Sequence, residues 1–183
     1  MDPTRIDNNF YLFGYGGTDW IVIGLEWAPR DEAIAWADSV LKQHPSRRGI
    51  LITHAYMYYD ERRYDHLDTA HPQDWNPHSY KTPDSINDGE ELWQKLVRQH
   101  DIPLVLNGHV LGDGTGYLLS SNDSGGSVHQ MLSNYQFREL GGEGYLRLLE
   151  FQPDGRTVKV QSYSVLYGSC LSAPDQHFSF ELD

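Results

Sequence analysis

The sequence predicts a single α/β domain with one mixed β-sheet, flanking helices and an antiparallel C-terminal portion. Three observations predict this fold. A strand–helix–strand pattern covers residues 20–53, and such a unit implies a parallel strand pair with a right-handed crossover. A second helix followed by a strand is indicated over residues 88–107. The last third consists of short strand-like runs between glycine-rich turns, which is typical of antiparallel pairing.

The N-terminal elements are predicted by periodicity and turn chemistry. Residues 10–15 and 20–25 are aromatic and β-branched runs around a Gly-Gly-Thr-Asp turn, so they predict a β-hairpin. Pro29 suits the first turn of a helix, because its φ is fixed and a missing N–H costs nothing there. One apolar face takes this helix to about Gln43, and a short buried strand follows over residues 50–53. The apolar face consists of Ala33, Ala37, Val40 and Leu41.

Residues 55–87 form a long segment that is rich in aromatic residues and histidines and has no clear period. A loop of this length in a compact domain is usually functional, as a lid or a binding loop. Asp88 and Glu91 then have capping-box spacing, which predicts a helix start before a strand over residues 104–107. Candidate antiparallel strands follow at residues 115–121, 128–133, 145–151, 157–164 and 177–182.

Composition limits the classes of function. The 183 residues are enough for a sizeable core, and a hydrophobic content of 39% argues against disorder. The net charge of -12 argues against a nucleic-acid partner, because binding phosphates requires a basic surface. No apolar stretch approaches the roughly 20 residues of a membrane span, so no membrane partner is expected. Cys170 is the single cysteine, which excludes an internal disulfide.

Two histidines follow two predicted buried strands. His54 ends the run Gly-Ile-Leu-Ile-Thr-His, and His109 ends the run Pro-Leu-Val-Leu-Asn-Gly-His. Ligands bind at the carboxyl ends of strands in α/β sheets, and imidazole is the commonest metal ligand among side chains. A lone histidine at a strand end more often bonds the backbone, but the shared context favours a metal-ligating pair. Two ligands are fewer than the three or four of most zinc sites.

Further candidate ligands lie near these histidines in the sequence. Asp113 follows His109 closely, and the long loop after His54 contains carboxylates and imidazoles. One such side chain joining the pair would give a mononuclear site with an open coordination position. We take Asp60 and Asp113, with the two histidines, as candidate catalytic residues. The alternative is that the loop is a solvated aromatic surface. The loop candidates are Asp60, Asp65, His66, His71 and His78.

The runs at residues 50–54 and 106–109 resemble the last two signature motifs of the calcineurin-like metallophosphoesterases. Residues 131–136 and 142–147 are similar to the C-terminal region of bacterial members. The resemblance covers nearly the whole chain but only the C-terminal half of that family's domain. It implies half of an αββα sandwich and a truncated domain over residues 1–183, and the start just before a hairpin also suggests truncation.

The resemblance implies a hydrolase of phosphate esters or related esters that uses two metal ions. His54 and His109 would bind the same ion, which the family draws from Mn, Zn, Fe or Ca. The family's ligand to the other ion stands two positions after the Gly-His motif, where this chain has Leu111. Its early Asp and His motifs have no match before His54. A conventional dinuclear site therefore cannot be assembled from this chain alone, which leaves a mononuclear site or no metal.

The resemblance also implies how the chain associates and what it acts on. A sheet face that packs on the absent half should be apolar and uncovered, and large exposed apolar patches favour association. We therefore expect a homo-oligomer, with a two-fold dimer as the simplest form, and a small-molecule ester as substrate. Bacterial members are often exported, although the N-terminal residues carry no signal-peptide pattern. Two alternatives stay open: a non-catalytic fragment or binding module, and a metal-independent hydrolase with a new site in the aromatic loop.

Overall fold

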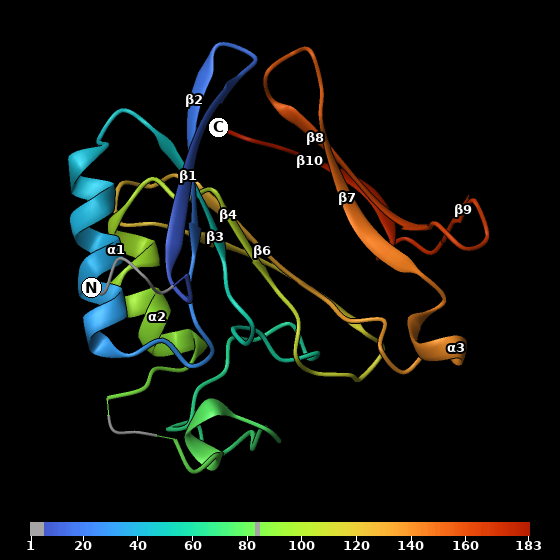
Figure 1. Ribbon diagram of the computed structural model, residues 1–183, viewed down its shortest axis with the longest axis horizontal. Coiled ribbons are helices and arrows are strands. Elements are labelled where there is room, and N and C mark those ends of the chain that lie inside the picture. The colour runs from blue at the N-terminus through green and yellow to red at the C-terminus, as the bar shows by residue number, and fades with distance from the viewer. Residues whose placement is uncertain (1–5, 83–84) are drawn as a thin grey trace.

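The computed structural model describes residues 6–82 and 85–183 and has an α/β fold with two β-sheets (Figure 1). The larger sheet is mixed and has six strands in the order β1-β2-β3-β4-β6-β5. The smaller sheet is antiparallel, with β8 between β10 and β7 and with β9 paired to β8. Helices α1 and α2 cover one face of the larger sheet, and the smaller sheet packs toward its other face.

The N-terminal elements confirm the predicted hairpin and strand–helix–strand unit. β1 (Asn9–Tyr15) and β2 (Thr18–Gly24) are antiparallel. Helix α1 (Asp31–Gln43) begins two residues after Pro29 and buries its predicted apolar face. β3 (Arg48–Ile52) then pairs with β2 in parallel. The crossover therefore places the carboxyl ends of β2 and β3 side by side.

The predicted capping box starts the second helix. In α2 (Gly89–Lys95) the Asp88 side chain accepts from the backbone N–H of Glu91, and the Glu91 side chain accepts from that of Asp88. β4 (Leu104–Asn107) follows and pairs with β3 in parallel. The long loop over residues 55–87 lies between β3 and α2, so its far end is fixed by this cap. Two single-turn 3-10 helices are η1 (Pro77–Ser79) and η2 (Val97–Gln99).

The predicted C-terminal strands form, but they divide between two sheets. β6 pairs in parallel with β4 and antiparallel with β5, so both extend the larger sheet. The expectation of one sheet is therefore wrong. β8 alternates buried Val158 and Val160 with exposed Lys159, and such a one-sided apolar face must pack against another layer. These elements are β5 (Thr115–Ser121), β6 (Ser127–Ser133), α3 (Glu139–Gly142), β7 (Tyr145–Phe151), β8 (Thr157–Ser164), β9 (Ser169–Cys170) and β10 (His177–Glu181).

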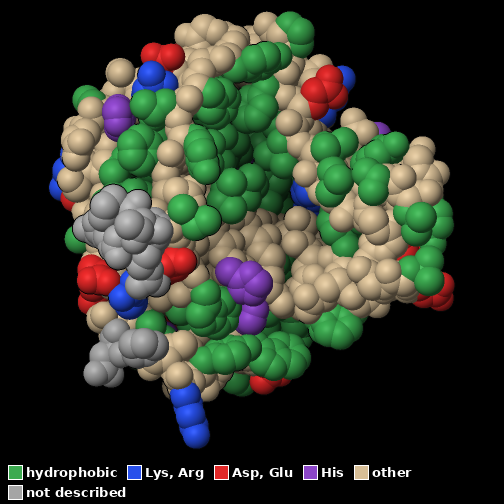
Figure 2. Space-filling view, viewed as in Figure 1, with side chains coloured by type: hydrophobic (Ala, Val, Ile, Leu, Met, Phe, Trp, Pro, Cys, Tyr) green, Lys and Arg blue, Asp and Glu red, His purple; other side chains and the backbone are tan. Residues whose placement is uncertain are grey.

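The second sheet also corrects the expectation of an uncovered face. A buried cluster joins the two sheets, with Trp20 and Ile50 on one side and Val158 and Phe180 on the other. Part of the face stays exposed along β1, where Tyr11 is 65% exposed. Figure 2 shows a hollow lined with hydrophobic side chains between the first hairpin and the second sheet. Among the described residues, no helix has the length and hydropathy that a membrane-spanning segment requires.

Candidate functional site

The structure brings the two predicted histidine ligands together. His54 follows β3 and His109 follows β4, and these strands are parallel neighbours. Backbone hydrogen bonds fasten the two strand ends, because Thr53 N–H donates to the Leu106 carbonyl and Gly108 N–H donates to the His54 carbonyl, both at 3.1 Å. Nε2 of His54 then lies 3.2 Å from Nδ1 of His109. The strand ends thus deliver both imidazoles to one point.

The separation of these two nitrogen atoms suits a shared metal ion. Two nitrogens that bind one zinc ion at about 2.1 Å, with an N–Zn–N angle of about 100°, are about 3.2 Å apart. The same distance fits a hydrogen bond between two neutral imidazoles, of which one donates and one accepts. A metal ion could therefore replace this hydrogen bond with little change in the distance between the nitrogens.

The tautomer of His109 is set by the long loop. Nε2 of His109 lies 3.0 Å from the carbonyl oxygen of Trp75, so Nε2 carries the proton and donates it. Nδ1 then carries the lone pair, and it is the atom that faces His54. Burial lowers the pKa of His109 below its ordinary value, and the nearby His54 lowers it further. The ring is thus neutral at pH 7 and able to act as a ligand.

The backbone at His109 is strained. Its φ is +77°, in the left-handed region that side chains other than glycine seldom adopt. The Asn134 amide group donates to the carbonyl oxygens of His109 and Val110, at 3.1 and 2.9 Å, and holds this turn. Asn107, at the end of β4, is buried and fastens two further backbone groups. Strain of this kind persists where the surroundings enforce it and is concentrated at functional sites.

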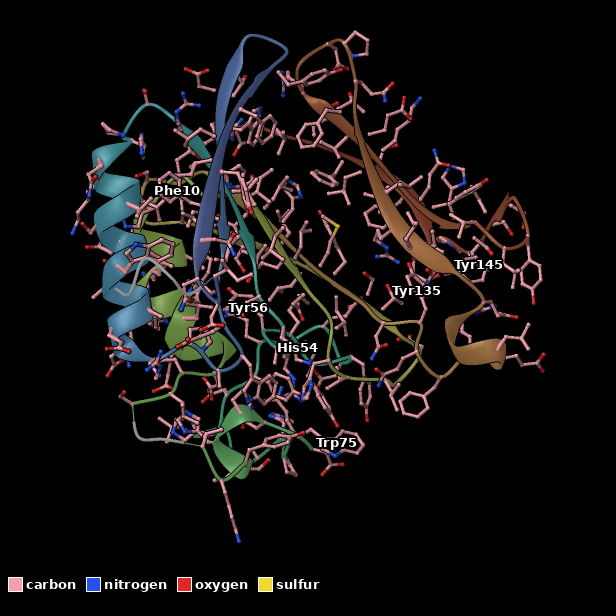
Figure 3. The ribbon with its side chains drawn as sticks, in the orientation of Figure 1. Phe10, His54, Tyr56, Trp75, Tyr135 and Tyr145 are labelled. Atoms are coloured by element: carbon pink, nitrogen blue, oxygen red, sulfur yellow. The ribbon has the colours of Figure 1, made fainter. Side chains whose placement is uncertain are left out.

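Aromatic side chains lie beside the two imidazoles. The ring centroid of Trp27, just beyond β2, lies 5.2 Å from that of His54 and 4.6 Å from that of His109. Tyr80 from the long loop packs against Trp27 at 5.1 Å. Figure 3 shows His54 at the end of its strand with Trp75 of the loop close to it. The aromatic walls therefore come from the long loop, through Trp75 and Tyr80, and from Trp27 in the segment after β2.

Two adjoining pockets open on the histidine pair. One of 340 Å³ is lined by both histidines, by Trp75 and by Leu111, and one of 410 Å³ is lined by both histidines, Trp27 and Tyr80. Figure 2 shows histidine side chains at the lower rim of the apolar hollow. Among the described residues that line these two pockets, none is a carboxylate, a lysine or an arginine. Leu111 puts an apolar side chain where the resemblance expects a second metal's ligand.

The structure does not bring Asp60 and Asp113 to the histidines. Both line a separate pocket of 620 Å³ to which neither histidine contributes. The Asp60 carboxylate pairs with Arg62, whose Nε lies 3.0 Å away, and Asp113 accepts from the backbone N–H of Thr115 in a tight turn. Their assignment as catalytic partners of the pair is therefore corrected. Closeness in sequence was misleading, because the chain turns away after each strand end.

The other loop candidates also lie elsewhere. Asp65 accepts from the backbone N–H of Leu67, and exposed His71 pairs with Asp68.

His66 and His78 instead meet the two capping residues of α2, Asp88 and Glu91, and one ligand atom from each of the four lies within 4.8 Å of the others. The sequence indicates the capping pair and the loop histidines separately, and no local pattern connects them. The sequence signal that spans both has a longer range: a pair of loop histidines 22 and 10 residues before a carboxylate capping box.

Comparisons with known proteins name no family for this chain. No family model matches the sequence, and no solved structure matches it. The chain is similar to an uncharacterized protein, YvnB, from Bacillus subtilis (strain 168), with 32% identity over 161 residues. The match covers 85% of this chain and 11% of that protein, so the chain corresponds to a small part of a much longer relative. The resemblance to metallophosphoesterases stays a prediction.

Proposed function

We propose that this chain is a metal-binding hydrolase domain that acts on phosphate esters or related esters, with His54 and His109 as ligands to one divalent ion. One observation carries the proposal. The hydrogen bond from Nε2 of His109 to the Trp75 carbonyl leaves Nδ1 facing Nε2 of His54 at 3.2 Å. Metal-binding histidines almost always donate their other N–H to a carbonyl or carboxylate in this manner.

The residues present fit one ion and do not fit two. Two imidazoles converge, but Leu111 occupies the position of a further ligand, and no carboxylate lines the described walls of either pocket. An ion bound at this point would act as a Lewis acid toward an ester oxygen and toward water. With two protein ligands its affinity should be low, and water or substrate would complete its coordination.

The pocket walls favour a substrate of low charge. No lysine or arginine is found among the described lining residues, and the chain as a whole carries a charge of -12. A dianionic phosphomonoester would therefore meet no cation except the metal, whereas a monoanionic diester or a neutral ester loses less on leaving water. Trp27 and Tyr80 give the organic part of such an ester an apolar surface beside the imidazoles.

The test is turnover of bis(p-nitrophenyl) phosphate and p-nitrophenyl acetate with added zinc or manganese. We expect metal-dependent activity that falls at least about tenfold in His54→Ala and in His109→Ala. His71→Ala is the matched control, since His71 is an exposed histidine of the long loop that pairs with Asp68, and it should keep full activity. Equal activity in all four proteins would contradict the proposal. Activity that survives exhaustive chelation would favour the metal-independent hydrolase, and metal binding without turnover would favour the binding module.

A further inference from the structure

We propose that His66, His78, Asp88 and Glu91 form a separate structural site for Zn²⁺ or a similar divalent transition metal. His66 and His78 come from the long loop, whereas Asp88 caps helix α2 and Glu91 lies in its first turn. A metal bound here would fasten the loop to the helix. This proposal does not depend on hydrolysis or on metal binding at the strand-end histidines.

The four side chains are arranged around one point. Nδ1 of His66 lies 2.8 Å from Oδ2 of Asp88, and Nε2 of His78 lies 2.6 Å from Oε2 of Glu91. The two imidazole rings are 3.8 Å apart between centroids. Two ligand atoms on a tetrahedral zinc ion are about 3.3 Å apart, so four atoms within 4.8 Å need only a small contraction. Two nitrogens and two carboxylate oxygens are a donor set that zinc accepts.

The charge of Asp88 also favours a cation. Its side chain has 0% exposure, and among the described residues its ion-pair partner is His66 rather than a lysine or an arginine. A buried carboxylate is costly unless a positive charge compensates it. A divalent ion held by this cluster would compensate the Asp88 and Glu91 carboxylates together.

The four-residue cluster is linked through Asn76 to Trp75, which lines the pocket at His54 and His109. Asn76 donates to the Asp88 carboxylate at 3.3 Å and accepts from the backbone N–H of His78 at 2.9 Å. The preceding residue, Trp75, has a φ of +56° and presents its carbonyl to His109. A metal at this cluster would therefore hold the turn that sets the tautomer of His109.

The experiment uses the full chain with His54→Ala and His109→Ala, which removes the first site. Isothermal titration with zinc, together with elemental analysis, should show one bound ion, and zinc should raise the midpoint of thermal unfolding. In the same background His66→Gln and His78→Gln should each weaken zinc binding at least about tenfold, because each removes one of four ligands. His71→Gln is the control and should bind zinc like its parent. Asp88 and Glu91 stay unchanged, so the helix cap is kept.

A second test follows zinc binding in the wild-type chain by NMR. Zinc should shift the imidazole C–H signals of His66 and His78 in a ¹H–¹³C NMR spectrum, and the His71 signals should stay in place. The proposal is overturned if those signals do not move, or if the double alanine variant, folded by circular dichroism, takes up no zinc. Uptake that is unchanged when His66→Gln and His78→Gln are combined would also overturn it. The cluster would then be a hydrogen-bonded clamp only.

Discussion

Nε2 of His109 donates a hydrogen bond to the carbonyl oxygen of Trp75 at 3.0 Å, and this bond decides which nitrogen of His109 faces His54. A loop residue thus controls the ligand atom of a strand-end residue. The long loop is therefore part of the site, although neither of its expected contributions, a metal ligand or a catalytic carboxylate beside the pair, is found there. Its contributions are a carbonyl group and aromatic walls.

Leu111→His should strengthen metal binding at the strand-end pair. Leu111 lines the same pocket as His54 and His109, so an imidazole at this position would bring a third ligand within reach. We expect zinc affinity to rise at least about tenfold in an isothermal titration. Leu111→Met is the control, since it keeps the apolar volume without an imidazole. Equal affinity in the two variants would show that position 111 does not reach the metal.

The state of His109 predicts how stability depends on pH. Its pKa in the folded chain is below the ordinary value, mainly because of burial, so the unfolded chain takes up the proton first as the pH falls. The free energy of unfolding should therefore drop as the pH falls below about 6.5, and His109→Gln should lack this contribution. Urea unfolding of both proteins without metal at pH 7.5 and pH 5.5 measures the difference. An equal loss of the free energy of unfolding in the wild type and in His109→Gln would contradict the lowered pKa of His109.

Gly89→Ala should destabilise the fold strongly. A Cβ atom at Gly89 would lie 1.9 Å from the carbonyl oxygen of Tyr56, which is backbone and cannot swing away. That oxygen also accepts from the Tyr64 N–H at 2.9 Å, so a shift would break the pairing at the start of the loop. We expect a loss of about 3 kcal/mol in the free energy of unfolding by urea. Gly14→Ala, where Cβ would meet the movable Asp19 side chain at 3.3 Å and the Thr18 carbonyl oxygen at an ordinary 3.9 Å, should cost much less.

Self-association through β1 stays a prediction, now confined to a smaller surface. β1 is the edge strand of the larger sheet, and Tyr11, Phe13 and Tyr15 on it are exposed. Exposed apolar edge strands favour pairing between chains. Sedimentation velocity over a dilution series should show a dimer that Tyr11→Lys dissociates and Val165→Lys, on an exposed turn, does not. A wild-type monomer at every concentration would refute it.

Much of the fold could be predicted because its signals are local. The glycines at the first turn, Pro29 before α1 and the capping box of Asp88 and Glu91 each act within a few residues. The division of the C-terminal strands between two sheets was not predictable, because period-two alternation reveals that Val158 and Val160 share a face but not which layer covers it.

In the candidate site, too, local sequence patterns predict what regular strands position but not what irregular loops position. Buried parallel strands fixed the meeting of His54 and His109, so their order and context were sufficient to predict it. The positions of Asp60 and Asp113 depend on how irregular loops turn, which no periodic pattern encodes. The gathering of His66 and His78 at the start of α2 likewise depends on loop packing, here through Asn76.

The most direct measurement of the central claim is a zinc titration of the variant with His66→Gln and His78→Gln, which isolates the strand-end pair. We predict that one zinc ion binds, that added His54→Ala weakens its affinity at least about tenfold, and that added His71→Ala leaves the affinity unchanged. Absence of zinc binding in a folded variant, or equal affinity with and without His54, would contradict it.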